Sequence, residues 1–163
     1  MRRTLLPLAL LVAVSGCGLL FGAADLTALE VAGRYRFTEY TLDPVSDAVR
    51  DANLLGDGLS EDMTILLRED GTVALQRLRG ENVDETLTSG TYAISGRTVT
   101  VRFDDGDVLE DFYMPSEVRF EGDGESLNAE VFREGINLED ISGDYRGITR
   151  ADVTLRIRLR EIG

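Results

Sequence analysis

The chain has 163 residues, with 30 acidic residues against 17 basic ones that are all arginine, and its formal net charge is −13. This charge argues against nucleic acid as a partner, because binding it needs a concentrated positive field, and favours a monomer through self-repulsion. The sequence has no histidine and one cysteine, which excludes Ser–His and Cys–His nucleophile pairs and zinc sites with imidazole or thiolate ligands. We therefore expect one non-catalytic domain without a metal or cofactor.

The first 17 residues have the order of a secretory signal. Arg2 and Arg3 precede an apolar run, and small residues lead up to Cys17. The apolar run is too short to cross a bilayer, which needs about 20 residues. The sequence Val-Ser-Gly-Cys at residues 14–17 resembles the lipobox of bacterial lipoproteins, which implies cleavage before Cys17 and lipid on its thiol. The alternative is an ordinary cleaved signal with an incidental cysteine.

This resemblance divides the chain into a signal peptide at residues 1–16, a lipidated tether at residues 17–32 and a folded domain at residues 33–163. It implies a protein of the bacterial cell envelope that is held on the membrane by lipid on Cys17, since the acidic body has no attraction to an anionic surface. Gly18, rather than aspartate, follows the cysteine. Similarity to enterobacterial lipoproteins then implies the outer membrane, if the source is a diderm bacterium.

The tether is expected to end in a short helix, because Thr27 and Glu30 have the spacing of a capping box. A disordered spacer is the alternative. The stretch GRYRFTEY, which begins at Gly33, then alternates, with Tyr35 and Phe37 on one face. This period of two predicts a half-buried first strand.

A second short helix is expected directly after this first strand. Four apolar residues recur there at helical spacing: Val45, Ala48, Val49 and Ala52. The Gly-Asp-Gly sequence at residues 56–58 is expected to end the helix.

The remaining chain predicts a meander of antiparallel strands joined by hairpins. Turn dipeptides occur at four places: Asp70-Gly71, Ser95-Gly96, Asp105-Gly106 and Asp123-Gly124. The last strand, at residues 152–161, alternates most regularly, with four residues on one face: Val153, Leu155, Ile157 and Leu159. Its open edge would be prone to aggregation, so we expect it to pair with the first strand. The prediction is an all-β, antiparallel up-and-down barrel of about eight to ten strands.

These features are similar to the lipocalin-like domains of bacterial lipoproteins. The similarity covers residues 31–162 and rests on Gly-Arg-Tyr at residues 33–35, the hairpin GTYAISGRTVTV and the arginine-bearing last strand. Tyr35 stands where true lipocalins have tryptophan. The resemblance implies a barrel able to hold one small ligand.

The candidate ligand-binding residues are those that alternation places inside this barrel: Tyr35, Phe37, Tyr92, Phe103, Leu155 and Ile157. In one hypothesis they line a pocket for a small apolar or amphipathic molecule. In the other they fill the core, and the outer face of a solid barrel docks an envelope protein. An enclosed apolar cavity of roughly 300 Å³ or more favours the first hypothesis.

Arginines gather on the opposite face of the first and last strands. They are Arg34 and Arg36 on the first, and Arg156, Arg158 and Arg160 on the last. A guanidinium group binds carboxylate or phosphate through paired hydrogen bonds, so these residues could form an anion site. The alternative is that they pair with aspartate and glutamate of adjacent strands.

Overall fold

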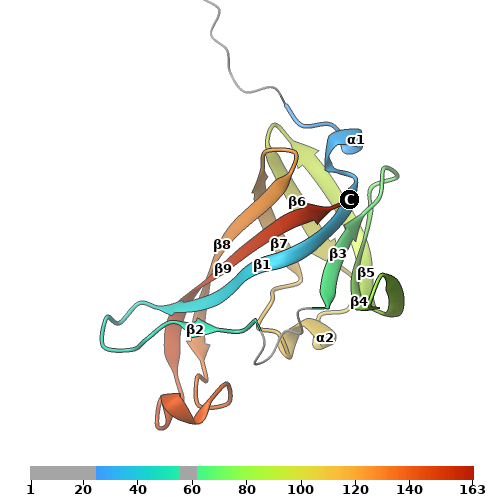
Figure 1. The fold of residues 1–163 in the computed structure, drawn as a ribbon. Coiled ribbons are helices and arrows are strands. Elements are labelled where there is room, and N and C mark those ends of the chain that lie inside the picture. The colour runs from blue at the N-terminus through green and yellow to red at the C-terminus, as the bar shows by residue number, and fades with distance from the viewer. Residues whose placement is uncertain (1–24, 56–61) are drawn as a thin grey trace, which may run out of the picture.

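The computed structural model describes residues 25–55 and 62–163, so the predicted signal peptide and Cys17 lie outside the described residues. This part of the chain forms a closed antiparallel β-barrel of eight strands, with a short ninth strand beside β1 (Figure 1). The strands are β1 (Gly33–Pro44), β2 (Ala52–Asn53), β3 (Met63–Leu67), β4 (Thr72–Arg79), β5 (Asn82–Ser95), β6 (Thr98–Phe103), β7 (Glu117–Gly122), β8 (Ser126–Ile136) and β9 (Ala151–Ile162). Except for the added β2, neighbouring strands follow one another in sequence, and the predicted up-and-down barrel is confirmed.

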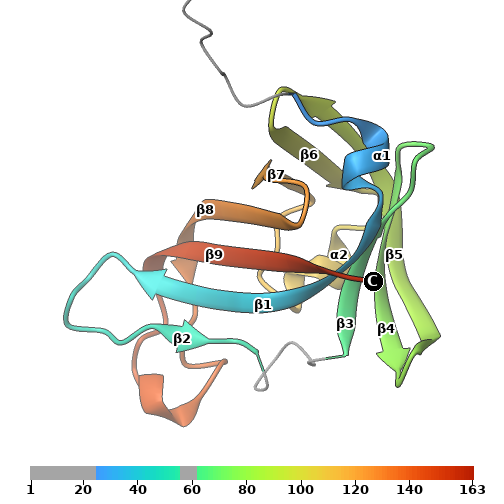
Figure 2. The ribbon, with the colours of Figure 1, turned by 45° about the horizontal axis from the view of Figure 1, so that its top comes forward.

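The barrel closes between its first and last strands, as predicted. β1 and β9 pair from Arg34 opposite Ile162 to Pro44 opposite Val153, with a register shift around Thr38. Figure 2 shows β1, β9 and β8 side by side, with β2 added near the outer end of β1. The pairing leaves neither β1 nor β9 with a long open edge, which removes the aggregation hazard.

Alternation along β1 and β9 produces the core. Tyr35, Phe37, Leu155 and Ile157 are all buried, whereas Arg158 on the opposite face of β9 is exposed. Because side chains of a strand point alternately to its two faces, every second residue of each strand contributes to the same interior. The core therefore lies within the barrel and includes side chains from all eight of its strands.

One end of the barrel is covered by α1 (Ala28–Val31), which the capping box predicted. The Thr27 hydroxyl accepts a hydrogen bond from the Glu30 amide at 3.3 Å, and the Glu30 carboxylate accepts from the Thr27 amide at 2.9 Å. The Thr27 hydroxyl also donates to the Glu30 carboxylate at 2.7 Å, and this bond, together with the one from the Thr27 amide, lowers the pKa of Glu30. Val31 is fully buried, and its carbonyl accepts a hydrogen bond from the Tyr35 hydroxyl at 3.0 Å.

The opposite end is covered by the segment that contains α2 (Asp107–Glu110) (Figure 1). Leu109 and Met114 are buried in the core. The Tyr40 hydroxyl donates to the Phe112 carbonyl at 2.8 Å and so ties this segment to β1. Burial raises the pKa of Tyr40, so this phenol keeps its proton and its hydrogen bond at neutral pH.

The prediction of a helix after the first strand is wrong. Residues 45–49 form bends and a turn, and β2 follows at residues 52–53, paired with β1. Ala52 and Leu54 are buried while Asn53 is exposed, and the Leu54 amide donates to the Tyr40 carbonyl at 2.8 Å. Pairing with β1 thus overrides a short helical pattern, and Val45 stays 66% exposed. The sequence pattern also missed α2 and the 3-10 helix η1 (Gly143–Tyr145).

Replacement of Leu155 by alanine is expected to lower the free energy of unfolding by about 2–5 kcal/mol, because the fully buried side chain leaves a cavity. The neighbouring Thr154→Ala change, on the outward face, is expected to cost about 0.5 kcal/mol or less. Denaturant melts of the purified variants measure both values. Equal losses at the two positions would contradict the assignment of the inner face of β9.

Candidate functional site

All six predicted interior residues lie in the barrel core. Tyr35, Leu155 and Ile157 are fully buried, and the other three are at most 9% exposed. They share the interior with further bulky residues such as Tyr40 and Phe120, which are also fully buried. The structure thus brings the six together as members of one packed cluster.

Several cavities in the described part of the chain lie outside this cluster. Four of them have volumes of about 620, 540, 430 and 290 Å³. Of the six predicted residues, Ile157 alone lines one of these four. The interior side chains therefore act as core packing, and the hollows form on the barrel wall.

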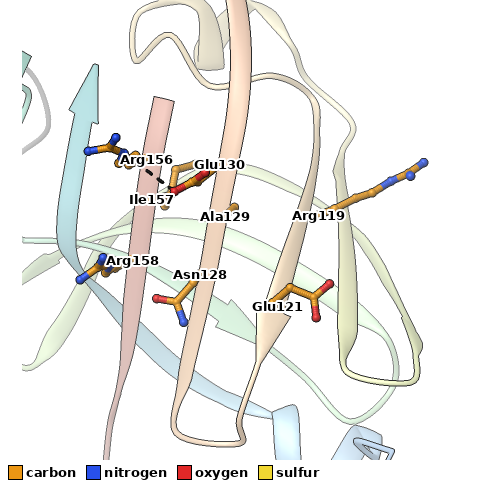
Figure 3. A pocket seen from close by; sticks show the side chains of 8 residues that line it. All are labelled: Arg119, Glu121, Asn128, Ala129, Glu130, Arg156, Ile157 and Arg158. Carbon is orange, nitrogen blue, oxygen red and sulfur yellow. Dashed lines mark ion pairs between the residues drawn. The ribbon is translucent and has the colours of Figure 1, made fainter. Parts of the chain in front are cut away.

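The largest of these cavities lies where β7, β8 and β9 meet (Figure 3). Its lining comprises Arg119, Glu121, Asn128, Ala129, Glu130, Arg156, Ile157 and Arg158. In Figure 3, Arg156 and Glu130 are joined across β8 and β9, whereas Arg119 extends from β7 away from them. This wall cavity was not predicted, because alternation identifies the face of a residue but not the places where strands separate.

The cavity adjoins a weak seam of the barrel. β7 and β8 pair only at Glu121 with Asn128 and at Gly122 with Leu127, next to their connecting turn. Beyond these two pairs the strands diverge without a shared ladder. The two strands therefore present facing edges along most of their length.

The hydrogen bonds of β7 show which of its backbone groups lack a partner strand. The Gly122 amide donates to the Arg97 carbonyl at 2.9 Å, and the Phe103 amide donates to the Ser116 carbonyl at 2.8 Å. In an antiparallel ladder, alternate residues exchange hydrogen bonds with one neighbour. Even-numbered residues of β7 thus bond to β6, and the backbone groups of Glu117 and Arg119 face the opening.

The same reasoning applies to β8. The Glu161 amide donates to the Glu125 carbonyl at 2.9 Å, so odd-numbered residues of β8 bond to β9. The backbone groups of Glu130 and Phe132 therefore face β7, and no residue of the described chain pairs with them there. The Phe132 side chain lies at this edge and is 56% exposed.

Charged residues on each side of the opening pair within their own side. Arg156 pairs with Asp43, and Arg158 lies 3.0 Å from Glu39, so the acid-pairing alternative is confirmed for these two arginines. On the other side, Arg102 donates to Glu117 at 2.7 Å and lowers the pKa of that carboxylate. Within the described chain no ion pair joins β7 to β8, so salt bridges do not span the opening.

The chemistry of this opening is that of backbone recognition. Free amide and carbonyl groups on a strand edge accept an extended segment as an additional strand. Among the described residues, no group of three or more Asp, Glu, Cys or His side chains could hold a metal ion. None of the helices formed by residues 25–55 and 62–163 is long and apolar enough to span a membrane.

Amide hydrogen exchange is expected to alternate along β8 in the free protein. The amides of Ala129 and Val131 bond to β9 and should exchange slowly, whereas those of Glu130 and Phe132 face the opening and should exchange fast. Residue-resolved NMR exchange rates test this pattern. Uniform protection from residue 129 to 132 would show that the seam is closed in solution.

No protein-family model matches the sequence, and no curated protein matches it. The β-barrel is therefore established from the structure of this chain alone.

Proposed function

We propose that this protein is a lipid-anchored lipoprotein of the bacterial cell envelope that docks an extended segment of a partner protein onto the free edge of β8. The observation that carries the proposal is the unpaired backbone of Glu130 and Phe132 beside an exposed aromatic side chain. Strand addition of this kind takes its affinity from main-chain hydrogen bonds and its specificity from alternate side chains.

The packed interior supports docking over ligand storage within the barrel. A small apolar ligand inside the barrel would have to displace fully buried side chains such as Tyr35 and Leu155. Displacing such side chains from a close-packed core costs free energy that a small ligand must offset. Ligand binding by the six interior residues is thus the less favoured function.

The acidic charge near the β8 edge favours a basic partner segment. Glu130 and Glu134 are exposed along the edge, and the whole chain carries a formal charge of −13. A segment that alternates basic and apolar residues complements these carboxylates and the Phe132 ring. A second copy of the chain is disfavoured, because two strongly acidic bodies repel one another.

Site-specific crosslinking tests the docking site. A photoreactive residue in place of Phe132 is expected to give a discrete adduct in intact cells, and the adduct is expected to disappear when Glu130→Pro is added. Proline removes the amide that faces the opening but none that bonds to β9, so the fold should persist. A denaturant melt of Glu130→Pro checks that stability.

Val83 supplies the matched control. This residue is also an exposed apolar side chain, 44% accessible, but it lies on β5, away from the opening. A photoreactive residue there is expected to give no adduct of the same size. The same adduct at both positions, or none at Phe132, would rule out docking at β8.

Cell fractionation tests the anchor. The Cys17→Ser change removes the thiol that would receive lipid, so the protein is expected to move from the membrane pellet to the soluble fraction. Wild-type protein fractionated in parallel provides the reference. A variant that stays in the pellet to the same extent would overturn the lipoprotein assignment, while leaving the docking proposal open to its own test.

A further inference from the structure

Within the described chain, the buried side-chain polar atoms that have no hydrogen-bond partner lie on the outer face of β1, β3 and β4. Three buried side-chain atoms have no hydrogen-bond partner there: Arg34 Nε, Thr64 Oγ1 and Gln76 Oε1. These residues are neighbours in the sheet. Thr64 of β3 lies opposite Arg36 of β1 on one side and opposite Gln76 of β4 on the other. Arg34, two residues before Arg36 in β1, lies opposite Leu66 of β3. An unpaired buried donor or acceptor is costly, so such a group usually has a water or a ligand as its partner.

Thr64 and Gln76 are the strongest part of this observation. The Thr64 side chain is fully buried although it points to the outer face of the sheet, and Gln76 is only 5% exposed. The Gln76 side-chain nitrogen donates to the Thr86 hydroxyl at 3.2 Å, but the Gln76 side-chain oxygen accepts no hydrogen bond. The outer wall at this point therefore holds polar groups that nothing in the described chain satisfies.

The same face carries cations without counterions. Arg34 and Arg36 form no ion pair with any described residue, whereas seven other arginines do. Arg36 also lies directly opposite Arg160 on β9, and like charges opposite one another destabilise a sheet. The acidic residue Glu81 lines the same cavity as the two arginines but makes no ion pair with either of them.

A cavity of about 540 Å³ opens on Arg34 and Arg36, whereas Thr64 and Gln76 are their neighbours in the sheet but do not line it. Arg34 and Arg36 supply its cationic lining, and Leu66, Leu78 and Ile162 supply its apolar lining. The volume lies in the range of small-molecule sites. The cavity shares no lining residue with the opening between β7 and β8.

We infer that this cavity binds an amphipathic anion, with a carboxylate or phosphate on Arg34 and Arg36 and an aliphatic chain on Leu66, Leu78 and Ile162. Guanidinium groups bind either anion through charge-assisted hydrogen bonds. Arg34 Nε adds an unused donor among the lining residues, and a donor matches an oxyanion rather than a cation. A bound anion also relieves the repulsion between Arg36 and Arg160. The inference is independent of docking at β8.

Calorimetric titration of the full chain tests the inference. The probes are decanoate and decyl phosphate, each below its critical micelle concentration, with decanol as the neutral control. Decanoate or decyl phosphate is expected to bind, and their relative affinity distinguishes a carboxylate ligand from a phosphate ligand. Decanol is expected not to bind, because it offers the arginines no charge.

Variants separate this cavity from general charge effects. Arg34→Gln and Arg36→Gln are expected to weaken binding about tenfold or more, since each removes charge-assisted hydrogen bonds. Arg77→Gln is the matched control, because Arg77 also lies on the barrel wall, in β4, but pairs with Glu85. Equal losses in all three variants, equal binding of decanol, or no binding of either anion would overturn the inference.

Thr64→Val gives a second readout. Removal of an unsatisfied buried hydroxyl is expected to leave the unfolding midpoint of the free protein unchanged or raised. Because Thr64 does not line the cavity, the same change is expected to leave anion affinity unchanged. A loss of anion affinity as large as that of Arg34→Gln would contradict the placement of the anion in this cavity.

Discussion

The pairing of β1 with β9 is the constraint on which the rest of the structure depends. It joins segments far apart in the chain, as in the hydrogen bond from the Thr38 hydroxyl to the Arg158 carbonyl, 120 positions away. Because this ladder fixes the register of both strands, it also fixes which residues of each face the interior. A slip of one residue would place Arg156 and Arg158 in the core.

The ladder between β1 and β9 runs along most of both strands, but the pairing of β7 with β8 is short. β8 follows β9 along most of its length, while β7 follows β6, and the two meet only at their shared turn. The hydrogen-bonded ladder is therefore long between β1 and β9 but interrupted between β7 and β8. A barrel of this kind keeps a packed interior and still offers strand edges to another chain.

The outer wall, rather than the interior, carries the features that a partner or ligand could recognise. Arg156 and Arg158 are neutralised by acids of neighbouring strands, whereas Arg34 and Arg36 are not. This difference follows from register: Glu39 lies opposite Arg158, but Arg160 lies opposite Arg36. The same arginine-rich pattern thus yields ion pairs along one part of β1 and an uncompensated cationic surface along another.

The sequence by itself determined the class of the fold and the inner face of its strands. Strand side chains alternate with a period of two, and this local signal placed Tyr35 and Leu155 inside without knowledge of any neighbour. The capping box at Thr27 was equally readable, because its bonds join residues three positions apart. Such features depend only on nearby residues and are visible in one chain.

Only the tertiary structure decided the features that depend on distant neighbours. The apolar residues from Val45 to Ala52 became a turn and a short strand because β1 offered backbone partners that outweighed a weak helical pattern. The opening beside Phe132 and the unpaired state of Arg36 arise from where strands diverge and which residues lie opposite one another. Register and divergence are set by the packing of the whole barrel, and no local periodicity encodes them.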